Sequence, residues 1–345
     1  MYRFLKKVLG FAIKIDVSTR KNLKDESFLS YLGKKISDME NDFRLNGGRR
    51  YALNSIANYR KIYMLWHDFE AVYGRTDLRF SQITMDTYSA FMGYCDIRGY
   101  KESTKYQYVS LVKTVMSEAF EDGVSKNIIH KSKGFVTHRD LSGGKKVYLT
   151  PDEIHAIERL DLSRGSLLDK ARDVFLAGYY TGQRFSDYST ISLKEVDTVE
   201  IDGVGYKVLR KRQKKTGNQV IIPILNGNLL AIIEKWGGKL PGISISTLNE
   251  KIKIICRMAG INSIVSAREN SSGDGLAYEH KWELVSSHTA RRSCLTNLHL
   301  EGKLTPEQIR SISGHRSERS YKQYLCQSSE EEAKEILKKY LYNIQ

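Results

Sequence analysis

The sequence has 345 residues, with 55 Lys and Arg against 40 Asp and Glu, and its formal net charge is +15. This length is enough for two domains that each bury a core. No apolar run approaches the roughly 18–20 residues that a membrane span needs, so we expect no membrane partner. The charge predicts a polyanion as partner, with nucleic acid the natural choice, although a solvated surface with a basic bias would have the same composition.

The cysteines are widely scattered and form no CxxC pair, so we expect neither structural zinc nor a disulfide framework. The N-terminus is basic and apolar, like the start of a signal peptide, but Lys14 interrupts its apolar core and no small-residue cleavage site follows. We therefore expect a cytoplasmic, nucleoid-associated protein. The cysteines are Cys95, Cys256, Cys294 and Cys326.

The first half of the chain has apolar residues at three- and four-residue spacing, which predicts helices. The expected helices span 29–45, 51–73, 84–99 and 103–123. They predict a small helical domain at 26–125, preceded by an N-terminal extension at 1–25 that could serve as an arm. The many Tyr and Trp residues lie at helical spacing and fit a core better than a surface for base stacking.

Residues 126–147 lack periodicity and predict a basic linker that would follow a DNA backbone. The excess of positive charge lies mostly in the N-terminal part of the chain. Residues 1–147 carry 26 Lys+Arg against 16 Asp+Glu, and residues 148–345 carry 29 against 24. The candidate DNA-contacting residues are Lys131, Lys133, Arg139, Lys145, Lys146, Lys214 and Arg292.

A second domain is expected at 148–328, and its first helix begins at the capping box Thr150-Pro151-Asp152-Glu153. Residues 204–224 predict a β-hairpin with a glycine turn, and a long loop is expected around Ser266–His280. A C-terminal helix is expected within 329–345. The predicted fold class is mainly α with a small β-hairpin, an α+β fold. Further helices are expected at 166–180, 226–236, 246–259, 287–301, 306–312 and 330–342.

Two features of the second domain offer isolated candidates for chemistry. Thr181-Gly182-Gln183-Arg184 is a glycine break after an apolar helix, and Asp187 follows close enough to orient Arg184. Surface Arg–Asp pairs are common, so this signal is weak by itself. Lys215 lies at the tip of the predicted hairpin, where it could act as a general acid or simply contact phosphate, and Lys214 is its nearest competitor.

A stronger pair of signals lies near the C-terminus. His288 lies in the first turn of a serine-capped helix, where the backbone favours anions, and Arg291 is on the same face. Gly314-His315 follows, and then Tyr324, which is one of 21 tyrosines. Each residue also has a structural explanation, as a capping or packed histidine or as a core tyrosine. Tyr321, one turn from Tyr324, is the alternative phenol.

Taken together and in order, these residues resemble the tyrosine recombinase family, also called phage integrases. The family pattern is an Arg in a TGxR turn, a Lys in a hairpin, HxxR, a GH pair and a Tyr nine residues after that histidine. The resemblance is specific over roughly 148–328, while the helical first domain resembles the core-binding domain only in general character. The matching residues are Arg184, Lys215, His288, Arg291, His315 and Tyr324.

The resemblance implies a helical core-binding domain joined to a catalytic domain that cleaves and rejoins double-stranded DNA. Tyr324 would be the nucleophile, Lys215 the general acid and Asp187 a supporting residue. The family works without ATP, metal or other cofactor. It acts as a homotetramer on synapsed DNA, so we expect a free chain that is monomeric or weakly associated. The C-terminal helix would then pack on its own subunit or exchange with a neighbour.

Two other functions remain open from the sequence. A type IB topoisomerase-like nicking and closing enzyme shares the active-site chemistry, and a non-catalytic DNA-binding accessory protein would share the charge. The intact set of catalytic residue types favours the recombinase. Neither the target sequence nor the choice between integration, excision, inversion and dimer resolution follows from the sequence. A mobile element in a bacterium is the expected setting.

Overall fold

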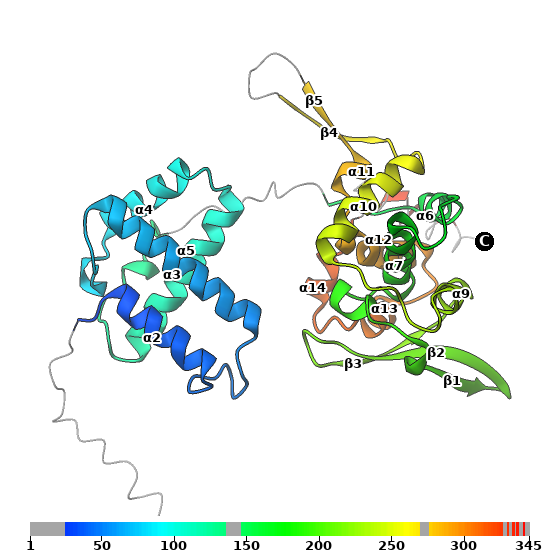
Figure 1. The fold of residues 1–345 in the computed structure, drawn as a ribbon, viewed down its shortest axis with the longest axis horizontal. Coiled ribbons are helices and arrows are strands. Elements are labelled where there is room, and N and C mark those ends of the chain that lie inside the picture. The colour runs from blue at the N-terminus through cyan, green and yellow to red at the C-terminus, as the bar shows by residue number, and fades with distance from the viewer. Residues whose placement is uncertain are drawn as a thin grey trace, which may run out of the picture. The chain divides into compact units, whose positions relative to one another are not determined.

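The computed structural model describes residues 25–135, 146–269 and 276–326, together with positions 330, 333, 334, 336, 337 and 341 (Figure 1). The chain divides between Gly143 and Gly144 into two compact units, here the first and the second unit. Arg139, Lys145 and residues 1–24 of the predicted extension lie outside the described residues. Within the described ranges, no helix is both long enough and apolar enough to cross a membrane.

The first unit is a bundle of helices around an aromatic core. Trp66 is its centre, with its ring 4.4 Å from that of Phe28 and 5.0 Å from that of Phe91. The helix containing Trp66 ends at Gly74, whose positive φ of 71° closes the last turn. The elements are α2 (Phe28–Glu40), α3 (Leu53–Tyr73), η1 (Phe80–Gln82), α4 (Met85–Ile97), α5 (Glu102–Glu121) and η2 (Ile129–Lys131).

Residues 126–135 of the predicted linker pack onto the first unit. The side chain of Asn127 donates hydrogen bonds to the carbonyls of Phe80 and Ile83, at 2.6 and 2.8 Å. Phe135 is buried, and its ring lies 4.3 Å from that of Tyr88. This stretch has no helical periodicity because single anchoring side chains hold it in place.

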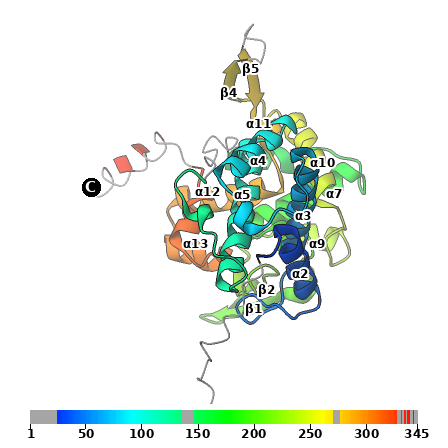
Figure 2. The same ribbon diagram turned by 90° about the vertical axis from the view of Figure 1, so that its left-hand side faces the viewer.

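The second unit is also mainly helical, with a small antiparallel sheet, and the predicted α+β fold class is confirmed (Figures 1 and 2). At its centre α7 packs against α10 and α12. The helices are α6 (Pro151–Glu158), α7 (Leu167–Thr181), α8 (Phe185–Tyr188), η3 (Leu193–Glu195), α9 (Asn228–Lys235), α10 (Ile245–Met258), α11 (Lys281–Leu284), α12 (Ser287–Glu301), α13 (Pro306–Ser313) and α14 (Glu318–Lys322).

The sheet has the strand order β1-β2-β3, formed by β1 (Val196–Ile201), β2 (Val204–Arg212) and β3 (Gln219–Pro223). The predicted hairpin is the β2–β3 pair, with Leu209 opposite Ile222. We did not predict β1, because its side chains are largely exposed and show no clean alternation of apolar and polar residues.

The prediction of a long loop around Ser266–His280 is wrong at both ends of this range, where the chain forms β-strands. β4 (Ile264–Glu269) pairs antiparallel with β5 (Leu276–His280), so that Ala267 lies opposite Tyr278. The Gly- and Ser-containing stretch between these strands concealed their pairing in the sequence. Figure 1 shows this hairpin projecting from the body of the second unit.

The described positions of the predicted C-terminal helix are helical. The apolar side chains of Ile336, Leu337 and Leu341 are exposed, at 62%, 58% and 61%. These three side chains are therefore not covered by the described residues of their own chain.

Candidate active site

Helix α12 places His288 and Arg291 on one face but at different depths. The backbone N–H of Ser286 bonds to Thr289 Oγ1 at 3.0 Å and fixes the first turn, where His288 is exposed. One turn later, Arg291 is completely buried. The two residues of the HxxR pattern thus differ in solvent exposure, since the histidine borders solvent and the arginine lies inside the unit.

Arg291 is held by two segments that are remote in the sequence. Its Nη1 donates to the carbonyl of Gly182 at 2.8 Å, and its Nη2 donates to His315 Nε2 at 2.9 Å. Burial, and then the neighbouring Arg184, lower the pKa of Arg291 to about 10, so the guanidinium remains charged at neutral pH. Among the described residues its Nε has no hydrogen-bond partner, which leaves this donor for a ligand.

The backbone conformation of Gly182 allows its carbonyl to accept the hydrogen bond from Arg291. It caps α7 with a φ of 61°, which few other residues adopt. A Cβ on this residue would lie 3.0 Å from Cys294 Sγ on α12. The glycine break recognised in the sequence therefore brings the Arg184 turn close to α12.

His315 is buried and serves as a hydrogen-bond acceptor for Arg291. Its Nδ1 lies 2.8 Å from Ser313 Oγ, and Ser313 Oγ itself donates to the carbonyl of Arg310. This pattern assigns the proton to Nδ1 and leaves Nε2 free to accept. Burial, together with Arg291 and Arg184, lowers the pKa of His315 to about 3, so the ring is neutral at physiological pH.

Tyr324 follows α14 and lies against the three other residues of the C-terminal pattern. Its ring is 4.8 Å from that of His315 and 6.3 Å from that of His288, and the Arg291 guanidinium lies 5.1 Å from its centroid. Tyr321 packs into the same small apolar cluster as Tyr324 and its ring lies 6.2 Å from that of His315, but it is only 1% exposed and its hydroxyl lies 3.4 Å from His299 Nδ1. The geometry thus separates the two candidate phenols.

Arg184 and Asp187 lie close together in the chain but do not pair with each other. Arg184 Nη1 is buried and has no hydrogen-bond partner in the described part of the chain. The buried Asp187 instead accepts the backbone N–H of Lys214 through Oδ1, at 2.8 Å. We expected Asp187 to orient Arg184, whereas its carboxylate holds the lysine hairpin.

Lys214 and Lys215 lie in the turn between β2 and β3, and both side chains are exposed. The positive charge of Lys215 lowers the pKa of His288, although less than partial removal from water and the neighbouring arginines do. The turn therefore lies within electrostatic range of the pattern on α12.

The other predicted DNA-contacting residues are spread over both units. Lys131 lies over the ring of Phe120 at 5.0 Å, and Lys133 is exposed. In the second unit, Lys146 donates to the carbonyl of Gln323 at 3.4 Å, beside Tyr324. Arg292 is half-buried next to Arg291.

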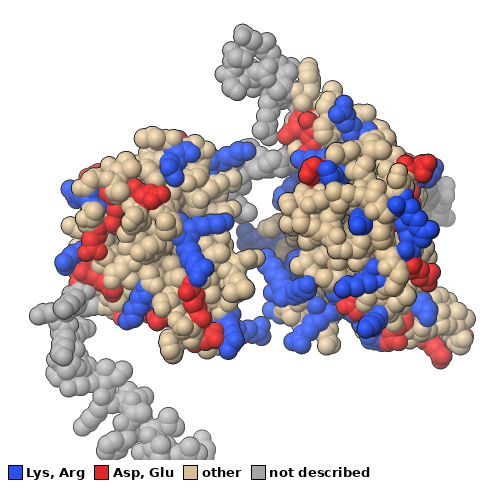
Figure 3. All heavy atoms as spheres, viewed as in Figure 1, with Lys and Arg blue, Asp and Glu red and all other residues tan. Residues whose placement is uncertain are grey.

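Positive charge also gathers in places that the sequence did not reveal. Figure 3 shows Lys and Arg concentrated at the edge of the second unit that carries α14 and the β2–β3 turn. The exposed cations of the turn, of α14 and of the residue before its N-cap are Lys214, Lys215, Arg316, Arg319 and Lys322. The last three were not predicted, although α14 could have been recognised as a short basic helix before Tyr324.

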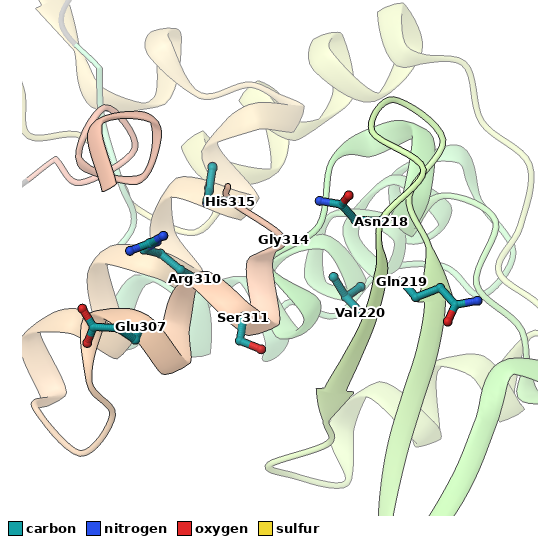
Figure 4. Close-up of a pocket in the computed structure, with 8 residues that line it drawn as sticks. All are labelled: Asn218, Gln219, Val220, Glu307, Arg310, Ser311, Gly314 and His315. Carbon is teal, nitrogen blue, oxygen red and sulfur yellow. The ribbon is translucent and has the colours of Figure 1, made fainter. Parts of the chain in front are cut away.

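A hollow of about 450 Å³ lies between β3 and α13 (Figure 4). Asn218 and Val220 extend toward it from the hairpin, and Arg310 and His315 border it from the other side. It gives solvent access beside the otherwise buried His315. In the described residues, no three His, Cys, Asp or Glu side chains lie close enough to hold a metal ion.

Comparisons with known proteins show one matching domain model and several solved structures with a similar fold. Residues 27–134 match the family model of the phage integrase SAM-like domain. The fold of the chain is similar to that of XerH site-specific recombinase bound to a palindromic difH substrate, with 12% identity, a TM-score of 0.61 and coverage of 86% of this chain and 91% of that one. No curated protein matches the sequence.

Two further structures are similar over most of the chain. The Tn1549 transposon integrase in complex with a circular intermediate DNA has 13% identity and a TM-score of 0.61, covering 91% of this chain and 99% of that one. The lambda integrase tetramer bound to a Holliday junction has 15% identity and a TM-score of 0.55, covering 92% and 86%.

Proposed function

We propose that this chain, which has the tyrosine recombinase fold and a phage integrase SAM-like domain, is a site-specific DNA recombinase. It would cleave and rejoin DNA through a 3′-phosphotyrosyl intermediate, in integration, excision or inversion. One observation carries the proposal: the ring of Tyr324 lies against His288, Arg291 and His315 at a single place.

The two arginines would bind the phosphate. Arg184 Nη1 and Arg291 Nε are buried donors without a partner among the described residues, and both belong to groups suited to non-bridging phosphate oxygens. They would stabilise the negative charge that develops on those oxygens in the transition state. Donors fixed before the substrate arrives cost no reorganisation during the reaction.

The proton transfers follow from the remaining residues. Tyr324 Oη would form a bond to phosphorus while the bond from phosphorus to the 5′-oxygen breaks. The phenol proton would pass toward the neutral imidazole of His288, while His315 would hold Arg291 in place through its Nε2, and Lys215 would protonate the departing 5′-oxygen. Asp187 would support this step by holding the backbone of Lys214.

The reverse reaction rejoins the DNA. A 5′-hydroxyl of another strand attacks the phosphotyrosyl bond, so the energy of the broken phosphodiester is retained. We therefore propose that the reaction needs no ATP, and that the two guanidiniums supply the positive charge that a metal ion provides in other phosphoryl transfers.

Complete recombination cleaves four strands, so the active form would be a homotetramer on two synapsed duplexes, in the cytoplasm at the nucleoid. The exposed apolar residues Ile336, Leu337 and Leu341 fit a C-terminal helix that packs only in that assembly. Functionally, the chain would then divide into an extension at 1–25, a core-binding domain at 26–125, a linker at 126–147, a catalytic domain at 148–328 and a C-terminal helix at 329–345.

The test is the covalent adduct. The full chain is incubated with a library of nicked suicide duplexes with randomised cores, and adducts that survive denaturation are sequenced to define the target. With that target, the native chain and Tyr321→Phe should form the adduct, while Tyr324→Phe should bind the DNA without forming it. An adduct from Tyr324→Phe would overturn the assignment of the nucleophile.

A supercoiled plasmid without the recovered target separates the recombinase from a topoisomerase. We expect no relaxation of this plasmid, because cleavage requires the site. Relaxation at a rate equal to that on a plasmid with the site would favour the nicking and closing enzyme. Binding with no adduct on any library member would favour the accessory protein.

A further inference from the structure

Two glutamine side chains lie in the interior of the second unit, where three segments of the candidate site meet. Gln183 is 0% exposed and immediately precedes Arg184, and Gln213 is 1% exposed and lies two residues before Lys215. The third segment is the turn 312–315, which ends at His315. Amides are rarely buried this completely unless their hydrogen-bonding groups are used.

The hydrogen bonds of Gln213 join all three segments. Its Nε2 donates to Gln183 Oε1 at 2.7 Å and to the carbonyl of Ser313 at 2.9 Å. Its Oε1 accepts from Thr216 Oγ1 at 2.8 Å, on the far side of Lys215. One side chain therefore links the lysine turn to both neighbouring segments.

Gln183 completes the arrangement. Its Nε2 donates to the carbonyls of Thr181 and Ile312, at 3.1 and 2.9 Å. Both amide hydrogens of each glutamine are thus used, so any apolar replacement leaves buried carbonyl oxygens without donors. We call Gln183 and Gln213 the amide clasp.

Gly314 makes room for the clasp. A Cβ on Gly314 would lie 2.5 Å from the amide atoms of Gln213, closer than any real contact. Its φ of 70° also ends α13 in the left-handed region. The glycine before His315 is therefore required by the packing of Gln213 as well as by the backbone.

The hairpin turn is fixed at two further points. Asp187 accepts the backbone N–H of Lys214, and Arg316 Nη2 donates to the backbone carbonyl of Thr216 at 3.4 Å and to Asn218 Oδ1 at 2.8 Å. The backbone on both sides of Lys215 is held in this way, while the lysine side chain is exposed. A long and flexible side chain then begins from a fixed point.

We propose that Gln213 is the positioning residue for Lys215, and that it acts by anchoring the lysine turn to the Arg184 and His315 segments. The proposal rests on the proposed function for the role of Lys215 as general acid. Misplacement of a catalytic group by about 1 Å can cost on the order of 100-fold in rate. We therefore expect Gln213→Leu to slow adduct formation by about 10- to 100-fold.

The first test needs no DNA. Hydrogen exchange of the free full-length chain is compared for native protein, Gln213→Leu and the matched control Gln219→Leu, whose side chain on β3 is exposed. Amides of the 209–221 peptide should exchange about tenfold faster or more in Gln213→Leu, while α7 peptides remain protected. Unchanged exchange at 209–221 would contradict the proposal that Gln213 anchors the lysine turn.

The second test isolates the protonation step. The suicide duplex is prepared with oxygen or with sulfur at the 5′-bridging position, and sulfur departs as a thiolate that needs no proton. The defects of Gln213→Leu and Lys215→Ala should both shrink to about threefold or less with sulfur, because the step that they impair is bypassed. Gln219→Leu should match the native chain on both substrates.

The outcomes of the two tests are separable. An equal defect of Gln213→Leu on oxygen and sulfur would mean that Gln213 supports folding or phosphate binding, and would overturn its assignment to Lys215. If the native chain formed no adduct with either substrate, the proposed function would fail, whereas the hydrogen exchange would still decide whether the clasp holds the turn.

Discussion

The aromatic core of the first unit differs in composition from the polar region beside α12 in the second unit, which lies next to that unit's own apolar core. In the first unit, Trp66 lies among aromatic rings, and its Nε1 donates to the buried carboxylate of Glu70 at 3.0 Å. In the second unit, the interior beside α12 holds Arg291, His315 and the amide clasp. Apolar burial is not directional, but each polar contact fixes a distance and an angle. The aromatic core of the first unit mainly supplies stability, and the polar region beside α12 fixes the geometry of the candidate site.

The polar region beside α12 carries a free-energy cost that apolar packing does not. Buried charges and donors destabilise a fold unless they find partners. Arg184 Nη1, Arg291 Nε and Asp187 Oδ2 have none among the described residues. A region that keeps such groups is explained by a ligand that completes them, and a phosphate would complete the two arginines.

The largest expected effect is on Arg291. Arg291→Lys keeps a positive charge but loses the planar fork that reaches Gly182 and His315. Adduct formation on the suicide duplex should fall by about 10²- to 10³-fold, the usual result of losing one such donor. Arg292→Lys is the matched control and should stay within about threefold of the native rate. A native rate for Arg291→Lys would show that the polar interior does not set the geometry.

The next effect tests the aromatic interior. Trp66→Phe removes the donor to Glu70 and should lower the free energy of unfolding by about 1–3 kcal/mol, measured by denaturant titration of the full chain. The adduct rate at saturating DNA and at a temperature where the variant is folded should remain native. A large loss of rate without loss of stability would erase the distinction between the two interiors.

A pH titration of stability sharpens the comparison within the second unit. The pKa of His315 is lowered from its ordinary value of 6.5 to about 3. Between these values the unfolded chain takes up a proton that the folded chain does not, so stability is present above pH 6.5 and is lost as the pH falls toward 3.

His315→Asn should therefore show a smaller decrease in Tm than the native chain between pH 7.5 and pH 4.5. His288 has a pKa lowered in the same direction, but it contributes equally to both proteins, so their difference isolates position 315. Parallel Tm curves for the two proteins would contradict the buried and neutral state of His315.

The sequence predicts the secondary-structure elements of the second unit better than the contacts between them. The expected helix 287–301 coincides with α12, because Ser286 begins it and Gly302 ends it through local backbone chemistry. The family-like spacing likewise brought together residues that the fold places around Tyr324. Capping and spacing are local signals that one sequence contains.

Contacts between segments that are distant in the sequence were harder to predict. Asp187 was expected beside Arg184, its neighbour in sequence, but its carboxylate bonds to Lys214, 27 residues away. Gln183 and Gln213 carry no periodic signal, since a single amide looks the same on a surface and in a core. Only the fold shows that the three turns meet, and this is why the clasp was not predicted.

The smallest expected effect separates two adjacent lysines. Lys214→Ala should weaken DNA binding and reduce the slope of log Kd against log salt by about one, because it removes one phosphate contact. The adduct rate at saturating DNA should stay within about twofold of native, because the alanine retains the backbone N–H that bonds to Asp187. Lys215→Ala should do the opposite, with a slow reaction and near-native affinity. If Lys214→Ala abolished cleavage at saturating DNA, the general acid would be Lys214, and the clasp would serve the other lysine of the same turn.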